Sequence, residues 1–117
     1  MDDILKATLL YDFYGELLTE RQKTVFEYYH LNDCSLTEIG EELGISRQAV
    51  RDLLKRTETL LAGYEEKLRL VERFGIQKES VRRIKNLAQE IEQTGGISTV
   101  AIEKIDKIKE IADEILD

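Results

Sequence analysis

The stretch from residue 35 to residue 56, SLTEIGEELGISRQAVRDLLKR, constrains the fold most, because it has the pattern of two short helices joined by a tight corner. Ser35, followed three residues later by Glu38, forms a capping box that predicts a helix from the next residue on. Gly44 predicts the end of that helix, since glycine adopts the left-handed conformation that a helix C-terminus often needs. Ser46 is a good N-cap for the following helix. These residues predict a helix-turn-helix.

The second helix of this pattern has two chemically different faces. Helical spacing places Ala49, Val50 and Leu53 inward. It places arginine, glutamine and lysine side chains outward, which is the right chemistry for a DNA major groove. Two amphipathic helices of an ordinary bundle would explain Gly44, but they would not explain why basic side chains cluster on one face. The pattern therefore favours a DNA-binding helix.

A recognition helix of this kind would lie in the major groove. We expect Arg47, Gln48 and Arg51 to reach base edges, because arginine pairs with guanine and glutamine with adenine through two hydrogen bonds. Hydroxyl and basic side chains at the two ends of the pattern would contact phosphates. The complete set of predicted DNA-binding residues is Ser35, Thr37, Ser46, Arg47, Gln48, Arg51, Lys55 and Arg56.

The composition is typical of long helices with solvated faces. The 117 residues are 42% hydrophobic and 35% charged, and they include no proline, so we predict an all-α fold. Cys34 and His30 are the only cysteine and histidine; we expect no disulfide, no metal site and no cofactor. The sequence offers neither a nucleophile–base pair nor a glycine-rich phosphate loop, so we expect no enzymatic activity. An acidic start and the lack of a long apolar run predict a cytoplasmic protein that is not inserted in a membrane.

The net charge of −7 is unevenly distributed. Residues 1–45 carry 10 acidic and 3 basic side chains, whereas residues 67–85 carry 7 basic and 2 acidic ones. Near the predicted recognition helix, only Asp52 opposes the arginines and lysines. The basic cluster around Arg82 and Arg83 is either a solvated helix face or a second surface for phosphates. A local basic surface is thus expected on an acidic body.

Periodicity predicts further helices on both sides of this pattern. We expect helices over 3–18 and 20–30, a long central helix from Arg47 to about Phe74 that stops at Gly75, and a C-terminal helical hairpin that begins near residue 77. In the first helix, the expected buried stripe is Leu5, Leu9, Phe13 and Leu17, with a second stripe at Leu10, Tyr14 and Leu18, and its aromatic side chains are expected in the core and not as a platform for bases. Thr19 and Gln22 form a capping box that predicts the start of the second helix. The expected core residues of that helix are Val25, Phe26 and Tyr29, and His30 is expected to cap its end. The predicted domains are 1–62, which contains the helix-turn-helix, and the helical extension 63–117.

Two seams of apolar side chains alternate steps of four and three residues, as in a coiled coil. The first runs along the central helix through Val50, Leu54, Thr57, Leu61, Tyr64, Leu68 and Val71. The second lies in the last helix, at Ala101, Ile105, Ile108, Ala112 and Ile115. We expect the extension to pack on the central helix or on a second subunit, which would give a homodimer through the C-terminal helices.

The segment from Leu10 to Arg56, with its continuation through Tyr64 to Leu68, resembles the YlxM family of small helix-turn-helix proteins, and the resemblance covers roughly residues 5–70. The segment 18–61 is also similar to region 4 of bacterial sigma factors, which belongs to the winged-helix-like superfamily. The run from Ser46 to Val50 is the most specific part of the resemblance. Members of the YlxM family are usually encoded beside signal recognition particle genes, so the resemblance implies a role in that pathway.

Two functions remain open at this point. The chain could be a DNA-binding regulatory protein that takes part in the signal recognition particle pathway. Alternatively, it could be an accessory module that does not bind DNA and instead contacts the protein or RNA of the signal recognition particle. The acidic side chains Glu38, Glu41 and Glu42 favour the second function, because phosphates repel carboxylates.

Overall fold

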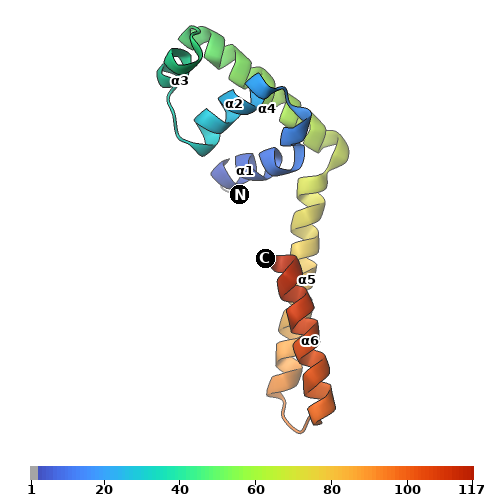
Figure 1. Cartoon of the computed structure of the whole chain (residues 1–117). Helices are drawn as coiled ribbons and strands as arrows, with labels where there is room; N and C mark the ends of the chain where they lie inside the picture. The colour runs from blue at the N-terminus through green and yellow to red at the C-terminus, as the bar shows by residue number, and fades with distance from the viewer. Residues whose placement is uncertain (1–2) are drawn as a thin grey trace. The chain divides into compact units, whose positions relative to one another are not determined.

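A computed structural model describes residues 3–117 of the chain, which form helices and short connections without any strand. The predicted all-α class is therefore confirmed (Figure 1). Two compact units follow one another, the first ending at Val71 and the second beginning at Glu72. The elements are α1 (Asp3–Tyr14), the 3-10 helix η1 (Gly15–Leu17), α2 (Glu20–Phe26), the π-helix η2 (Glu27–Leu31), α3 (Leu36–Leu43), α4 (Arg47–Leu68), α5 (Leu70–Gln93) and α6 (Thr99–Leu116).

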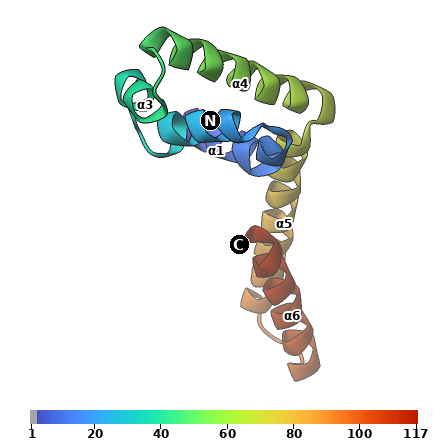
Figure 2. The same cartoon turned by 45° about the horizontal axis from the view of Figure 1, so that its top comes forward.

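Helix α4 forms the spine of the first unit, and α1, α2 and α3 all pack against it (Figure 2). The predicted seam of α4 is buried over three turns: Val50, Thr57 and Leu61 are fully buried and Leu54 is almost so. The Thr57 hydroxyl is satisfied inside the helix, because it donates to the Leu53 carbonyl oxygen at 2.9 Å. The seam is interrupted at Leu68, which is 47% exposed, whereas its last residue, Val71, is buried. Most of this heptad pattern is thus used within one chain.

The two predicted stripes of the first helix are only partly buried. Leu5 and Leu17 are about half exposed, whereas Ala7, Tyr14 and Leu18 are buried. The reason is that α1 ends at Tyr14 and the tighter turns of η1 follow, so Leu17 no longer continues the rotation of the preceding helix. The aromatic side chains of α1 are confirmed as core: Tyr14 is 1% exposed, and Tyr11 stacks on Phe26 with ring centroids 5.4 Å apart.

The predicted helix over 20–30 is split into two forms. The capping box of Thr19 and Gln22 is confirmed at its start, with both hydrogen bonds formed. After Phe26 the chain continues as the π-helix η2, and there Tyr29 is 39% exposed instead of lying in the core. His30 does not serve as a simple helix cap, because its Nε2 atom lies 2.8 Å from a carboxylate oxygen of Glu58 on α4. This pair ties η2 to the spine.

The long central helix is shorter than predicted. It ends at Leu68, where Arg69 adopts the left-handed conformation with a φ of 55°, and Gly75 lies inside α5. The break is made by Tyr14 and Glu65, which supply the cap that α5 needs. The Tyr14 hydroxyl donates to Glu65 Oε1 at 2.5 Å and accepts the backbone N–H of Leu70 at 3.1 Å.

The same Glu65 oxygen also accepts the backbone N–H of Val71 at 3.0 Å. Two N–H groups that would have continued the hydrogen-bond ladder of α4 are thereby bound to side chains instead. Because side chains bind these N–H groups, the helix can break without a glycine at this position.

The predicted boundary between the domains 1–62 and 63–117 falls inside α4, which runs from Arg47 to Leu68.

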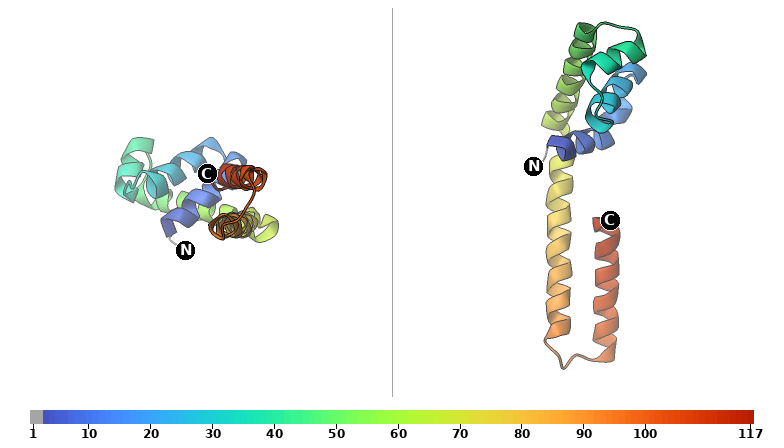
Figure 3. Two further views of the ribbon diagram at one scale, coloured as in Figure 1. Left: turned by 90° about the horizontal axis from the view of Figure 1, so that it is seen from below. Right: turned by 90° about the vertical axis from the view of Figure 1, so that its left-hand side faces the viewer.

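The second unit is a helical hairpin. Within residues 72–117, α5 and α6 run side by side in opposite directions (Figure 3). Gly95 and Gly96 both have positive φ in the connection, and the Ser98 hydroxyl caps α6 by accepting the Ala101 N–H at 3.1 Å. Lys85 pairs with Asp113 at 2.6 Å and Lys109 with Glu92 at 3.1 Å. The in-chain partner of α6 is therefore α5.

Candidate nucleic-acid interface

The corner between α3 and α4 has the geometry that the sequence predicts. Gly44 has a φ of 70°, and its N–H donates to the carbonyl oxygen of Gly40. The Ile45 N–H donates to the same oxygen at 3.0 Å. A Cβ atom on Gly40 would lie only 2.7 Å from the Ile45 carbonyl oxygen. Glycine at position 40 is therefore needed because the backbone of the corner itself folds back onto α3.

Both helices of the motif begin with the predicted caps. The Ser35 hydroxyl accepts the Glu38 N–H and the Glu38 carboxylate accepts the Ser35 N–H, each at 3.1 Å. The pKa of Glu38 is held below its usual value, first by the Ser35 backbone N–H and second by the Ser35 hydroxyl, because hydrogen bonds from these groups favour the charged carboxylate. At the start of α4, the Ser46 hydroxyl accepts the Ala49 N–H at 3.1 Å. Ser35 and Ser46 are thus engaged in caps, while both remain exposed.

The two faces of α4 are separated as the sequence predicts. Val50 is fully buried, and Ala49 and Leu53 are half-buried. All eight predicted DNA-binding residues are exposed, namely Ser35, Thr37, Ser46, Arg47, Gln48, Arg51, Lys55 and Arg56. The buried seam fixes the rotation of α4, so its basic face is held towards solvent.

The three side chains predicted to reach bases lie around one hollow. Arg47, Gln48 and Arg51 line a depression of about 240 Å³ together with Leu36, the first residue of α3. The arginine and glutamine side chains supply hydrogen-bond donors around the apolar side chain of Leu36. A base edge or a phosphate could be bound at this place by those donors.

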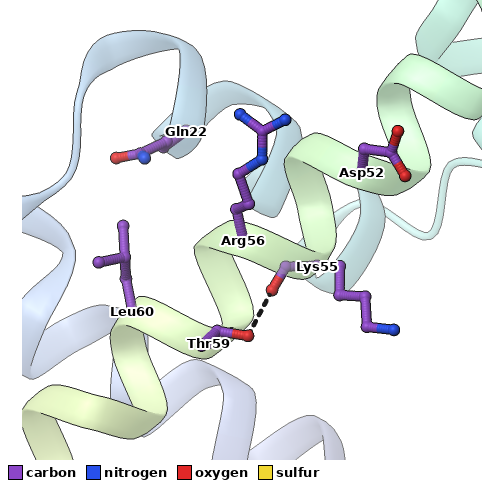
Figure 4. Close-up of a pocket in the computed structure, with 6 residues that line it drawn as sticks. All are labelled: Gln22, Asp52, Lys55, Arg56, Thr59 and Leu60. Carbon is purple, nitrogen blue, oxygen red and sulfur yellow. Dashed lines mark hydrogen bonds between the residues drawn. The ribbon is translucent and has the colours of Figure 1, made fainter.

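A larger open groove of about 610 Å³ lies further along α4, between that helix and α2 (Figure 4). Figure 4 shows the Arg56 guanidinium pointing towards Gln22 of α2, while the Lys55 ammonium points away from it. Lys55 also lines a neighbouring hollow of about 320 Å³ with Arg51. Both predicted phosphate ligands therefore line this groove, and Lys55 lies in addition beside Arg51 in the neighbouring hollow.

The basic face contains one carboxylate that interacts with a predicted base-reading residue. The Gln48 Nε2 atom donates to Asp52 Oδ1 at 3.0 Å, one helical turn away. Asp52 therefore orients the Gln48 amide. The Asp52 carboxylate lies one helical turn after Gln48 and one turn before Arg56 on α4. On α3, Glu41 and Glu42 are exposed. The surface is thus mixed in charge, with its cations concentrated on α4.

Four residues that line the groove are outside the predicted site, namely Gln22, Asp52, Thr59 and Leu60. Gln22 and Thr59 line the groove beside Arg56. Gln22 was recognised only as part of a capping box, and no local signal indicates that it lies across from α4. Thr59 donates its hydroxyl to the Lys55 carbonyl oxygen at 2.9 Å.

Residues 3–117 contain neither a metal-binding group of side chains nor a membrane-spanning helix. Over that range, no group of three or more histidine, cysteine or acidic side chains is arranged to hold a metal ion. Of the helices described, none is both long enough and apolar enough to span a bilayer. Neither finding replaces the α3–α4 surface as the candidate site.

Two helices joined by a glycine corner, with a solvent-facing basic second helix, define a helix-turn-helix protein. The chain belongs to the UPF0122 family, described as "Putative helix-turn-helix protein, YlxM / p13 like", whose profile matches residues 1–108. The resemblance to the YlxM family is therefore confirmed. The feature by which this family is described is its helix-turn-helix.

Relatives from several bacteria support this assignment. The chain is 43% identical over 108 residues to the UPF0122 protein YlxM of Bacillus subtilis, covering 91% of this chain and 98% of that protein. It is 56% identical over 84 residues to a UPF0122 protein of Caldanaerobacter subterraneus, covering 72% of each chain. A UPF0122 protein of a Thermoanaerobacter species is 62% identical over 72 residues, and the match spans 62% of each chain.

Proposed function

We propose that this protein binds double-stranded DNA by placing the N-terminal half of α4 in the major groove. The observation that carries the proposal is the shared hollow of Arg47, Gln48 and Arg51 on the exposed face of a helix anchored by buried Val50. An α-helix fits the major groove, where each base pair presents its own pattern of donors and acceptors. Membership of a helix-turn-helix family supports the same function.

The side chains of this hollow have defined roles in the proposal. Arg47 and Arg51 each present a planar set of donors that suits O6 and N7 of guanine. Asp52 holds one N–H of the Gln48 amide, which leaves the second N–H and the carbonyl oxygen for a base. Asp52 thereby limits the orientations of Gln48, but its negative charge would lie close to the DNA phosphates and repel them.

Phosphate contacts come from the flanks of the motif. Lys55 and Arg56, which line the same groove of α4, would bind phosphates there, and the exposed hydroxyls of Ser35 and Thr37 would bind near the start of α3. Neutralising about two phosphates gives a log–log slope of affinity on salt near −2. With a net charge of −7, binding is expected to be weak. A slope near −2 corresponds to a loss of roughly tenfold in affinity between about 50 and 200 mM salt.

The biological role that follows is regulatory. A small protein that reads a few base pairs would act by occupying a DNA site near the genes it controls. Two-fold pairing of chains would present two recognition helices and double the number of contacts.

The proposal is tested by fluorescence anisotropy with labelled duplexes, including the promoter region of the protein's own gene, at two salt concentrations. Arg47→Ala/Arg51→Ala should weaken binding about 100-fold, since each arginine–guanine pair contributes about 1–3 kcal/mol. Lys104→Ala removes an exposed cation of α6 that belongs to neither predicted phosphate surface, and should leave binding unchanged. Asp52→Asn keeps an acceptor for Gln48 and removes a repulsive charge, so it should strengthen binding several-fold.

A wild-type protein that binds no duplex even at low salt would refute the proposal. Equal binding by the wild type and the double arginine variant would refute the assignment of α4 as the reading helix. In the first case, the next titrations would be with the protein and RNA of the signal recognition particle, the alternative that the sequence left open.

A further inference from the structure

The hairpin of residues 72–117 carries an apolar face that nothing in the hairpin covers. Its core contains only three residues that are less than a tenth exposed, namely Ala88, Ile105 and Ala112. Six larger side chains are 43–59% exposed, namely Ile84, Leu87, Ile91, Ile108, Ile111 and Ile115. An apolar patch of this kind marks an interaction surface.

These exposed side chains form one stripe on each helix. On α5 they follow at steps of three and four residues, at positions 84, 87 and 91, and on α6 they do so at 108, 111 and 115. Such steps keep a stripe on one side of its helix. Counting about 100° per residue from Ala88 on α5 and from Ile105 on α6, both stripes are rotated about a quarter turn in the same sense from the α5–α6 contact. In an antiparallel pair, equal rotations lead to the same face, so the two stripes adjoin.

Charged side chains flank the two stripes in the same order. On α5, Leu87 lies between Arg83 and Glu90 along one edge of its stripe. On α6, Ile111 lies between Lys107 and Glu114 with the same spacing of four and then three residues. All four charged side chains are exposed, and within residues 3–117 none of them has an ion-pair or hydrogen-bond partner.

The charged residues on the opposite edge of the hairpin behave differently. Lys85 with Asp113 and Lys109 with Glu92 are already paired within the chain. These pairs also give the register of the hairpin, because they show which turns of α5 and α6 lie level. In that register, Arg83 is within one helical turn of the level of Glu114, and Glu90 is within one turn of the level of Lys107.

We propose that the hairpin is the docking surface for a second copy of this chain, and that the two copies form a four-helix bundle. A two-fold axis parallel to the hairpin would place α5 of each copy against α6 of the other, again antiparallel. Arg83 then meets the partner's Glu114, Glu90 meets the partner's Lys107, and Leu87 packs on the partner's Ile111. Two-fold symmetry makes each of these contacts twice.

Charge complementarity identifies the occupant. An antiparallel arrangement of two segments with the order basic, apolar, acidic sets every cation opposite an anion and every apolar residue opposite another. The chain carries both segments itself, so its surface is complementary to its own copy. Flanking charges of this kind determine partner choice and orientation in helical bundles.

The test uses the full chain without DNA, in sedimentation equilibrium at concentrations up to about 100 μM, a range that detects micromolar dimers. The wild type should be dimeric. Arg83→Glu and Glu114→Arg should each weaken the dimer about tenfold or more, because each creates two like-charge contacts. Glu110→Arg, the same change at another exposed position of α6, should leave the dimer unchanged. Leu87→Asp should give a monomer with unchanged helical content, since Leu87 is 59% exposed in a single chain.

The decisive arm combines the two reversals. Arg83→Glu/Glu114→Arg in one chain should restore the dimer, and an equimolar mixture of the two single variants should form heterodimers that are tighter than either homodimer. A wild type that is monomeric throughout would overturn the proposal. Dimers whose strength does not depend on residues 83 and 114 would also overturn it, because the copies would then meet elsewhere.

Discussion

Gly40→Ala is the sharpest test of how the corner of the motif is built. The added Cβ would lie 2.7 Å from the Ile45 carbonyl oxygen, which is a backbone atom and cannot rotate away. Relieving the overlap means displacing the corner, at about 1–3 kcal/mol for overpacking. The displacement would also strain the bond from the Ile45 N–H to the Gly40 carbonyl oxygen, which contributes about 1 kcal/mol.

The higher helix propensity of alanine offsets about 1 kcal/mol of this cost. The net expectation is a loss of about 2 kcal/mol, or roughly 10 °C in melting temperature for a unit of this size. Gly63→Ala is the matched control, because Gly63 is also helical but has no atom within 4 Å of its added Cβ. That variant should gain about 0.5–1 kcal/mol and melt a few degrees higher.

The assay is thermal unfolding followed by near-ultraviolet circular dichroism of tyrosine. All five tyrosines lie in residues 1–71, so the signal reports the unit that contains the motif and not the hairpin. If Gly40→Ala melted at or above the temperature of Gly63→Ala, the close approach of the corner to α3 would not be what requires glycine at position 40.

Two further perturbations follow from the same unit. Gly44→Ala should cost about 1 kcal/mol, because alanine is strained at a φ of 70° even though the space around Gly44 is open; chemical denaturation measures it, and an unchanged midpoint would contradict it. Tyr14→Phe leaves the Leu70 N–H without its acceptor and should cost about 1–3 kcal/mol at pH 7. Burial, and then the bond to Glu65, raise the pKa of Tyr14 above 10.0, so its contribution is fully present below pH 10 and is lost as the pH rises further; a pH titration of stability should therefore decline less steeply above pH 10 in the variant than in the wild type.

Much of the candidate site could be predicted from the sequence, because it depends on local interactions. The capping box at Ser35, the left-handed Gly44 and the cap at Ser46 each involve atoms only a few residues apart. The exposure of Arg47 and Arg51 follows from the rotation of one helix with a strong apolar seam. The location of Arg56 beside Gln22 could not be predicted, since it depends on how α2 crosses α4.

The sequence by itself determined the helices, their caps, the corner and the face of α4 that carries the cations, since these depend on neighbouring residues and on a period of about 3.6. Only the tertiary structure decided where the central helix ends, because that break is made by Tyr14, which is 51 residues away from its partner Glu65. It also decided which side of α1 is buried and which hollows the basic residues share. These features arise from contacts between distant segments, and such contacts leave no periodic signal in the chain.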